Sequence, residues 1–556
     1  MPNASNSAVD AIAEEYLERL VKLDPITATY LGIPGHDTEL NDFSPAGAAA
    51  SQELSLSTLG KLRSLGHLTG RGRIAAAAMG ERLQLAIDLF DAGEYKRQLN
   101  VIESPLQYVR MAFDLMPAAS EEDFSAIAQR LALVPRTLAG YRVSLQEGLS
   151  EGSPAPARQA LAGAAEARAY AAPGGYFANL AASYRGDDAV LAVRLADAAT
   201  AAAAAYDEFA GWLERDYAPA GHTSDYVGAE RWQLACRTYN GMTLDVVETY
   251  RWGWEELARI EAEMIRVASQ IAPGEALELV MSSLDERPGY VIEGEENFLA
   301  WNQRLLDETM DALAGKHFDV SADVRRLEAR LAPPGGAAAM YYTAPSADFS
   351  RPGRTWYPTM GRTVFPLWTE VSTAYHEGVP GHHMQIAQIL DLGERINVFQ
   401  RMLGGISGHT EGWALYAERL MDELGFLEDP VYKLGMLAAQ AFRAARVVVD
   451  IGLHHQCRIP PGHRFLPAEV WTPELAVELI HWMSGRERAF SESEVDRYLG
   501  WPAQATSYKV GERVWLETRE ASRAARGNAF SLKEFHHRGF ELGYVGLAQL
   551  REELGN

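Results

Sequence analysis

The sequence is poor in cysteine and lacks long uncharged hydrophobic runs. Its 556 residues include only two cysteines, Cys236 and Cys457, which are too few for a disulfide framework. No uncharged apolar stretch reaches the roughly 18–20 residues of a membrane span, so we expect no contact with a membrane. The first residues carry neither a basic head nor an apolar run, so we expect no signal peptide and a cytoplasmic location.

Positive charge is scarce relative to negative charge. The chain has 51 Lys and Arg residues against 75 Asp and Glu residues, which gives a formal net charge of −24. This balance argues against nucleic acids and anionic membrane surfaces as partners. With 47% hydrophobic and 23% charged residues the composition is that of a globular protein with a substantial core. We expect a soluble protein and allow for a homodimer.

Helical periodicity dominates the chain. Near the N-terminus, Ile12, Tyr16, Leu20 and Leu23 recur at helical spacing, and residues 154–217 are rich in alanine, the best helix former. We interpret this alanine-rich stretch as close-packed helices rather than low complexity, because large apolar residues recur throughout it. A joint at 221–226 would separate an N-terminal helical lobe (1–225) from a metal-binding catalytic part (226–556), so the sequence predicts a mainly α protein.

Residues 333–366 differ from the rest of the chain. Short β-prone runs such as Ala339–Thr343, Thr355–Pro358 and Thr363–Pro366 alternate with Gly and Pro. This pattern predicts a small sheet directly before the histidine-rich stretch described next. An edge strand there would suit a peptidase, because such enzymes hold extended substrates through main-chain hydrogen bonds.

The stretch from Thr373 to Gln385 contains a His-Glu pair, His376-Glu377, followed by His382-His383. In the common zinc-hydrolase motif H-E-x-x-H, two histidines four residues apart share a helix face and bind one ion, and the glutamate activates water. Here the histidines lie six and seven residues after His376. On a straight helix His383 would lie about 10.5 Å further along the axis, which is too far for a shared ion.

A break in the helix would bring the ligands together again. Pro380 cannot donate a hydrogen bond to the carbonyl of His376, and Gly378 and Gly381 permit unusual backbone angles. A two-residue loop-out would make His382 the natural second ligand, although His383 stays open as an alternative. The other interpretation is a helix that ends at Gly378 and carries histidines without a metal.

A second helix supplies the candidate third ligand. Glu411 lies 35 residues after His376, at the predicted start of a helix that stops at Gly425. A carboxylate from a second helix is the expected third zinc ligand, whereas the alternative role is a first-turn acid that favours the helix dipole. Glu418 would orient one histidine from behind or pair with Arg419 or Arg401.

Other polar residues are candidates for catalysis and substrate binding. Tyr508 would stabilise an oxyanion, or it is a core tyrosine. His454 shares a helix face with Asp450, a pair that is more often structural. Arginines could clamp a substrate carboxylate or form ordinary ion pairs, and the candidates are Arg351, Arg354, Arg443 and Arg446, of which we favour Arg351 and Arg446.

These motifs resemble those of the domain-of-unknown-function family numbered 885. The matching pieces extend over essentially the whole chain and are Asp24-Pro25, Ala28–Gly32, Asn41–Pro45, Ser350–Gly353, His376–Gln385, Glu411–Glu418, Asp450–His454 and Gln504–Gly511. The family is similar, distantly, to the carboxypeptidase Taq family and to thimet-type oligopeptidases. This resemblance implies a large two-lobed, zincin-like helical fold with a deep central groove. It also implies zinc held by His376, His382 and Glu411, with Glu377 as the base.

The sequence therefore predicts a zinc-dependent metallopeptidase that acts on short peptides, with removal of C-terminal residues as one mode of action. Catalytic roles fall to Glu377, Tyr508 and His454, and Zn²⁺ is the expected cofactor. One rival is a catalytically inactive helical binding protein that keeps a peptidase-like groove. Another is a zinc amidohydrolase that acts on a non-peptide amide, because its zinc and glutamate chemistry would be the same.

Overall fold

The computed structural model describes residues 4–332, 339–463 and 466–555. Helices account for 67% of the residues and strands for 5%, which confirms the prediction of a mainly α protein. The chain forms two compact units. Unit 1 comprises residues 1–226 and 496–501, and unit 2 comprises residues 227–495 and 502–556.

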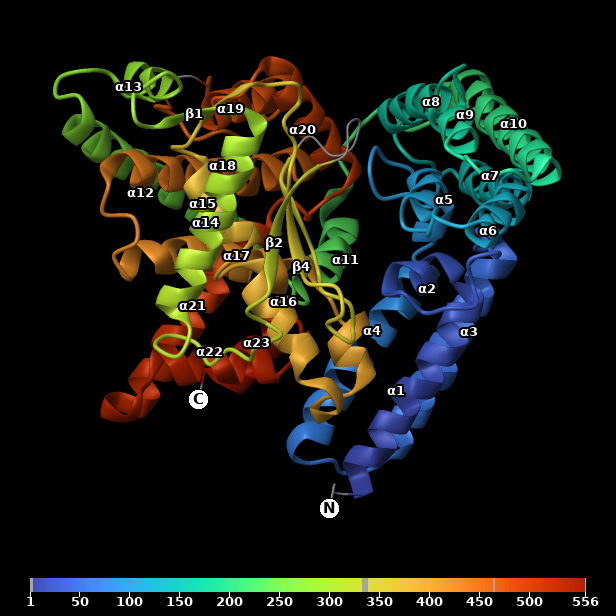
Figure 1. Ribbon diagram of the computed structural model, residues 1–556, viewed down its shortest axis with the longest axis horizontal. Helices are drawn as coiled ribbons and strands as arrows, with labels where there is room; N and C mark the ends of the chain where they lie inside the picture. The colour runs from blue at the N-terminus through green and yellow to red at the C-terminus, as the bar shows by residue number, and fades with distance from the viewer. Residues whose placement is uncertain (1–3, 333–338, 464–465, 556) are drawn as a thin grey trace. The chain divides into compact units, whose positions relative to one another are not determined.

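Unit 1 is built from helices, which Figure 1 shows in blue and green. They are α1 (Ala4–Leu23), α2 (Pro25–Leu31), α3 (Pro45–Ser64), α4 (Gly70–Asp91), α5 (Pro105–Asp114), α6 (Glu121–Leu131), α7 (Val134–Ser150), α8 (Ala157–Ala171), α9 (Tyr176–Ala182) and α10 (Ala189–Trp212), with short 3₁₀ or π turns at Glu94–Lys96, Leu213–Tyr217 and Ala218–Ala220. Proline begins several of these helices, where its missing N–H costs nothing because no helical carbonyl would accept from it.

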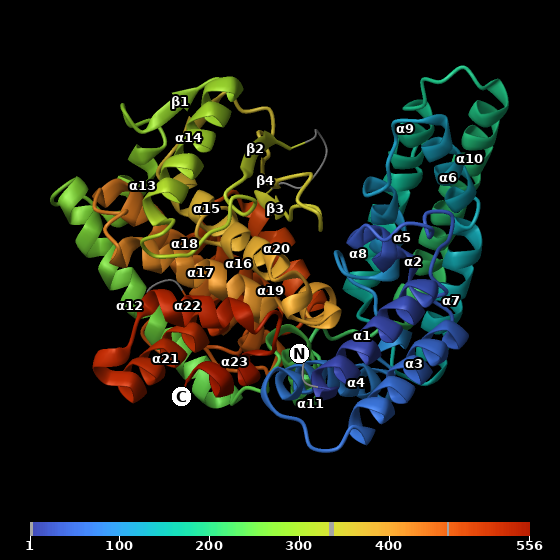
Figure 2. The ribbon, with the colours of Figure 1, turned by 60° about the horizontal axis from the view of Figure 1, so that its bottom comes forward.

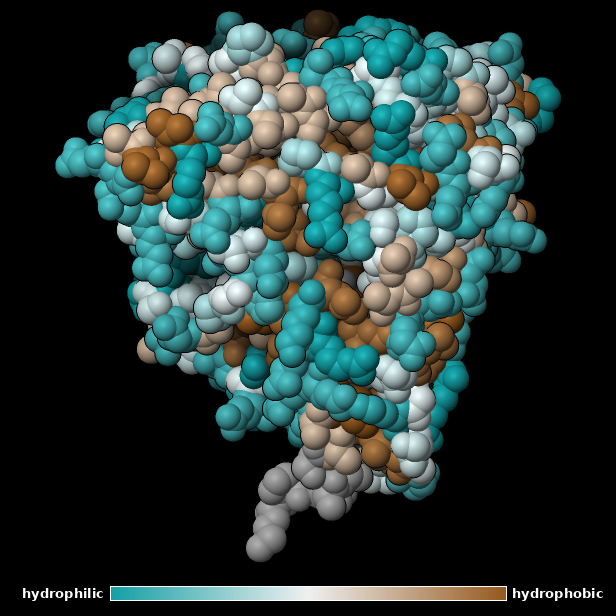
Figure 3. Space-filling view, turned by 90° about the vertical axis from the view of Figure 1, so that its right-hand side faces the viewer, coloured by the Kyte–Doolittle hydropathy of each residue, from teal (hydrophilic) through white to brown (hydrophobic). Residues whose placement is uncertain are grey.

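The core of unit 1 gathers around α10, which packs against α6, α7, α8 and α9. Leu195, Ala202 and Tyr206 on one side of α10 are fully buried, which confirms close-packed helices in the alanine-rich stretch. The segment Ala189–Ala220 is long and apolar enough to cross a membrane by length and composition, since an 18-residue window within it has a mean hydropathy of 1.3. Because a core helix rich in alanine meets the same criterion, this single segment is weak evidence for a membrane span. On the face shown in Figure 3, hydrophobic residues lie interspersed among hydrophilic ones.

Unit 2 contains the remaining helices. They are α11 (Gly228–Asn240), α12 (Val246–Ile271), α13 (Leu277–Leu284), α14 (Glu295–Leu313), α15 (Glu370–Glu377), α16 (His382–Asp391), α17 (Ser407–Glu423), α18 (Pro430–His454), α19 (Pro473–Ser484), α20 (Arg488–Gly500, whose last turn belongs to unit 1), α21 (Ser507–Arg526), α22 (Leu532–Glu541) and α23 (Leu547–Leu554). Helices α17 and α21 approach closely through glycines, since a Cβ on Gly412 would lie 2.4 Å from the Cα of Gly511.

Two small sheets complete unit 2. Strands β1 (Val291–Glu293) and β5 (Val364–Pro366) pair antiparallel. In the other sheet, β4 (Gly353–Tyr357) lies between a parallel partner, β2 (Leu327–Leu331), and an antiparallel one, β3 (Tyr341–Thr343). Figure 2 shows this sheet beside α14.

The predicted β-structure before the histidine stretch is confirmed by β3, β4 and β5. The prediction missed β1 and β2, which precede the predicted segment, and it joined into one sheet strands that belong to two. The start of the predicted segment, residues 333–338, lies outside the described residues.

Candidate metal centre

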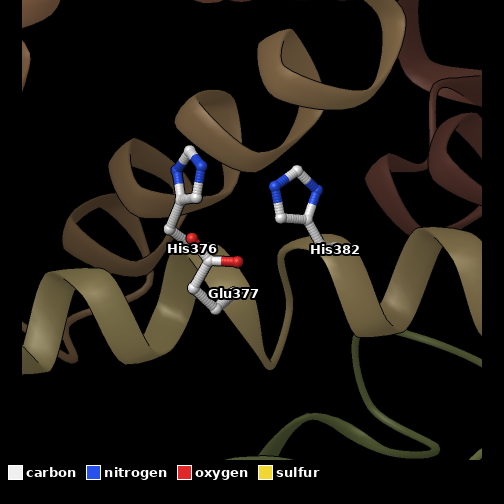
Figure 4. Close-up of side chains that lie close together, drawn as sticks. All are labelled: His376, Glu377 and His382. Carbon is white, nitrogen blue, oxygen red and sulfur yellow. The ribbon is translucent and has the colours of Figure 1, made fainter. Parts of the chain in front are cut away.

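The helix that carries His376 breaks where the sequence predicts. Helix α15 ends at Glu377 and α16 begins at His382. The chain folds back so closely between them that a Cβ on Gly381 would lie 1.9 Å from the carbonyl oxygen of His376, so only glycine fits there. Figure 4 shows the result, with His376 and Glu377 at the end of one helix and His382 at the start of the next.

Trp413 holds the break in place. Its indole Nε1–H donates to the carbonyl oxygens of Pro380, at 2.9 Å, and Gly381, at 3.1 Å, the two residues that directly precede α16. Trp413 is fully buried on α17, two residues after Glu411. The same helix therefore supports the break and presents the candidate third ligand.

Four side chains converge at this place. Ligand atoms of His376, Glu377 and His382 all lie within 4.8 Å of one another. Glu411 Oε2 lies 3.2 Å from Nε2 of His376 and 3.5 Å from Nε2 of His382. Ligands of one tetrahedral zinc ion, each about 2.0–2.1 Å from the metal, lie about 3.3 Å from one another. Two histidines and a carboxylate at these separations fit the donor set of a catalytic zinc site.

Glu418 orients His376 from behind. Nδ1–H of His376 donates to Oε1 of Glu418 at 2.8 Å, and the hydroxyl of Ser372 donates to the other carboxylate oxygen at 2.5 Å. This arrangement directs Nε2 of His376 toward Glu411, as in the carboxylate–histidine pairs of metal sites. The alternative pairing of Glu418 with Arg419 is wrong, because Arg419 pairs with Glu512 and Glu256.

His383 points elsewhere. Its Nε2–H donates to the carbonyl oxygen of Val324 at 2.7 Å, and its Nδ1 lies 3.0 Å from the hydroxyl of Tyr342 on β3. Burial lowers the pKa of His383 to about 4, so the ring stays neutral with both nitrogens engaged. Of the two candidate second ligands, only His382 lies beside His376 and Glu411, and its ring centroid is 4.9 Å from that of His376.

The buried charges shift one another's protonation. Burial raises the pKa of the Glu377 carboxyl, while the positive charges of His382, His376 and Arg443 oppose that rise. Burial also acts on Glu411, but His382 and His376 outweigh it and hold its pKa well below the usual range. Burial thus favours the protonated form of Glu377, whereas the two histidines favour the ionised form of Glu411.

Tyr508 and Arg446 extend the cluster. The ring of Tyr508, at the start of α21, lies parallel to that of His376 with centroids 6.5 Å apart. The guanidinium of Arg446 lies 4.8 Å from the centre of the Tyr508 ring and pairs with Glu494 at 2.8 Å. Tyr508 is thus next to the histidines, and Arg446 already has a carboxylate partner.

Arg351, Arg354 and His454 are the remaining predicted residues. Arg351 precedes β4, where its guanidinium interacts electrostatically with Tyr342 and Glu328. Arg354 pairs with Glu328 at 3.0 Å. His454 is fully buried at the end of α18, and its catalytic role stays a prediction.

Sequence reasoning missed Trp413, Ser372 and the two partners of His383. Trp413 lies within the Glu411–Glu418 motif, so a buried indole N–H in need of an acceptor was a signal that could have been followed. No comparable signal marks Val324, which contributes only its backbone carbonyl.

The profile of the family "Bacterial protein of unknown function (DUF885)" matches residues 25–554, so the chain belongs to this family. Among curated proteins, none matches the chain. A crystal structure described as a "putative lipoprotein" from Colwellia psychrerythraea is similar, with a TM-score of 0.84, 23% identity and coverage of 99% of this chain and 98% of the other. A "putative lipoprotein of unknown function" from Shewanella oneidensis gives a TM-score of 0.74 at 18% identity, covering 97% and 98%. At these identities the likeness shows the fold alone.

Proposed function

We propose that the protein is a zinc-dependent metallopeptidase that hydrolyses short peptides and has a zincin-like catalytic fold. The observation that carries the proposal is the convergence of His376, His382 and Glu411 at zinc-ligand separations, with Glu377 beside them. Two histidines, a glutamate ligand and a neighbouring glutamate base are the equipment of a metallopeptidase. The likeness of the motifs to those of carboxypeptidase Taq and thimet-type peptidases supports the same reading.

His376, His382 and Glu411 would hold the ion, which when bound supplies Lewis-acid activation of water and of the scissile carbonyl. Glu377 has the raised pKa of a group that can accept a proton from the attacking water and later give it to the leaving amine. Glu418 keeps the imidazole of His376 in one orientation. Tyr508, beside His376, would donate a hydrogen bond to the oxygen that becomes negative.

Strand β3 offers a way to hold the substrate. It is the outer strand of its sheet, and its Tyr342 contacts His383, the neighbour of His382. A peptide that aligned along this edge would form main-chain hydrogen bonds with the strand close to the candidate metal centre.

A peptide digest tests the proposal. Purified protein, loaded with zinc, is incubated with a mixed library of peptides of four to ten residues, and the products are read by mass spectrometry. We expect new products that vanish after treatment with a chelator and return when zinc is added. Zinc binding without cleavage of any peptide would contradict the proposal and favour an amidohydrolase for another amide. A failure to bind zinc would favour the inactive binding protein.

A further inference from the structure

Arg362, Arg443 and Arg486 are among the arginines of unit 2 that have no carboxylate partner among the described residues. The described residues place no Asp or Glu oxygen within 4.0 Å of the guanidinium groups of Arg362, Arg443 or Arg486. Most other arginines of unit 2 form such pairs, including Arg446, one helical turn after Arg443. Guanidinium groups that lack a carboxylate around a candidate active site are candidates for substrate recognition.

Arg443 is the most constrained of the three. It is half-buried on α18, and its Nε is buried without a hydrogen-bond partner. Its guanidinium makes a long 3.4 Å hydrogen bond to the carbonyl oxygen of Ala439 and lies 6.0 Å from the centre of the Phe442 ring. A buried N–H of a charged group left without an acceptor is costly unless a ligand completes it. Among the described residues, none provides a hydrogen-bond acceptor for Nε of Arg443.

The position of Arg443 links it to the candidate catalytic residues. Arg443 and Arg446 are three residues apart and so share a face of α18. Arg446 stacks on Tyr508, and Tyr508 stacks on His376. Helices α18 and α15 pack together. Arg443 therefore lies on the side of α18 that faces the candidate site.

Arg486 flanks the same place from the turn between α19 and α20. Its guanidinium lies 5.4 Å from the ring of Phe490, whose centroid is 6.0 Å from that of Phe442, the neighbour of Arg443. The side chain is exposed, so a ligand can reach it.

We infer that Arg443 and Arg486 form a subsite that binds a carboxylate of the substrate next to the candidate metal centre. Two guanidinium groups can donate several charge-assisted hydrogen bonds to one carboxylate. This inference rests on the proposed peptidase function and replaces Arg351 and Arg446 as the favoured substrate clamp. The carboxylate can be the free C-terminus of a peptide or an acidic side chain.

Matched peptides distinguish these two sources. We would compare an N-acetylated tetra-alanine with a free C-terminus, the same peptide as a C-terminal amide, and an amide whose last residue is glutamate. Wild-type protein should cleave the free acid roughly 10- to 100-fold faster, by kcat/KM, than the plain amide, the range expected for charge-assisted hydrogen bonds. Fast cleavage of the glutamate amide as well would identify a side-chain carboxylate as a second source.

Two variants and a control test the arginines. Arg443→Gln and Arg486→Gln should each lose most of the preference for the acid over the amide, while zinc content and melting temperature stay unchanged. Arg443→Lys should keep part of the preference, because lysine retains the charge but not the planar fork. Arg251→Gln is the matched control, since this side chain is 70% exposed on α12. Equal cleavage of acid and amide by the wild type, or a preference that both glutamine variants retain, would overturn the inference.

A binding experiment separates the failure of this inference from that of the proposed function. If the wild type cleaves none of the peptides, the peptidase proposal fails, and the subsite is then tested by calorimetry. Tri-alanine should bind roughly 10-fold or more tightly than tri-alanine amide to the wild type and equally weakly to Arg443→Gln. Equal affinities for acid and amide in the wild type would overturn the subsite on its own.

Discussion

The two units of the chain bury different kinds of side chain. Among the described residues of unit 1, Arg130 is the one buried charged side chain, and the rest of the core consists of apolar residues with a few neutral polar ones. Unit 2 buries His376, His382, Glu418, Lys509 and other ionisable residues. His376 pairs with Glu418 between α15 and α17, and Lys509 pairs with Glu256 between α21 and α12. Buried ionisable groups are costly, so a core that keeps many of them is where function is expected.

Removal of the candidate base should have the largest effect. Glu377→Gln keeps the shape of the side chain but cannot accept a proton, so kcat should fall by roughly 10²–10⁴-fold. Zinc content and thermal stability should stay at the wild-type level, because Glu377 is not among the three proposed ligands. Steady-state kinetics and elemental analysis of the same preparation check this. Full activity in the variant would remove Glu377 from the mechanism.

A large cavity in unit 1 should act on stability alone. Phe209 is 3% exposed and stacks on Tyr141, so Phe209→Ala should lower the free energy of unfolding of unit 1 by about 3–5 kcal/mol. Val193→Ala on the same helix removes a side chain that is 60% exposed and should change it by about 0.5 kcal/mol or less. Denaturant unfolding measures both. A loss of bound zinc in Phe209→Ala under native conditions would contradict the prediction, because it would show that the core of unit 1 affects metal binding in unit 2.

The orienting carboxylate of unit 2 should have an intermediate effect. Glu418→Gln weakens the hydrogen bond to Nδ1 of His376, so zinc affinity should fall by roughly 10–100-fold. Competition with a fluorescent zinc chelator measures the change. Glu423, farther along α17, pairs with Arg519, and Glu423→Gln serves as the control. An unchanged zinc affinity in Glu418→Gln would show that Glu418 supports the fold but does not tune the metal site.

Acid should destabilise unit 2 through its buried histidines. Burial, with the charges of Arg519 and His317, lowers the pKa of His536 to about 3, against about 6.5 in the unfolded chain. Below pH 6.5 the unfolded state therefore binds a proton that the folded state does not, so the free energy of unfolding decreases as the pH is lowered. Between pH 6.5 and 5 the loss should be about 2 kcal/mol from His536 alone.

Denaturant unfolding at the two pH values, with His536→Gln as reference, measures this loss. The variant should show a dependence on pH that is smaller by that amount. Unit 1 buries no histidine among its described residues, so its unfolding should respond less to pH in this range. An identical response of wild type and variant would show that His536 takes up its proton in the folded state.

The local features of the site followed from the sequence better than the long-range ones. Pro380 and the nearby glycines predicted the break in the helix, and the helical stretch that stops at Gly425 predicted a second helix with Glu411 at its start. The choice between His382 and His383 could not be made, because it depends on Val324 and Tyr342, 59 and 41 residues before His383. The pairing of β1 with β5 was missed for the same reason, since periodicity does not report contacts between distant segments.

The central claim is that His376, His382 and Glu411 hold one zinc ion while His383 does not. Elemental mass spectrometry of the wild type and of His382→Ala, Glu411→Ala and His383→Asn, each purified in the same zinc-containing buffer, tests it most directly. We predict about one zinc per chain in the wild type and in His383→Asn, and little in the other two. Zinc that persists in His382→Ala and disappears in His383→Asn, or a wild type that binds none, would contradict the claim.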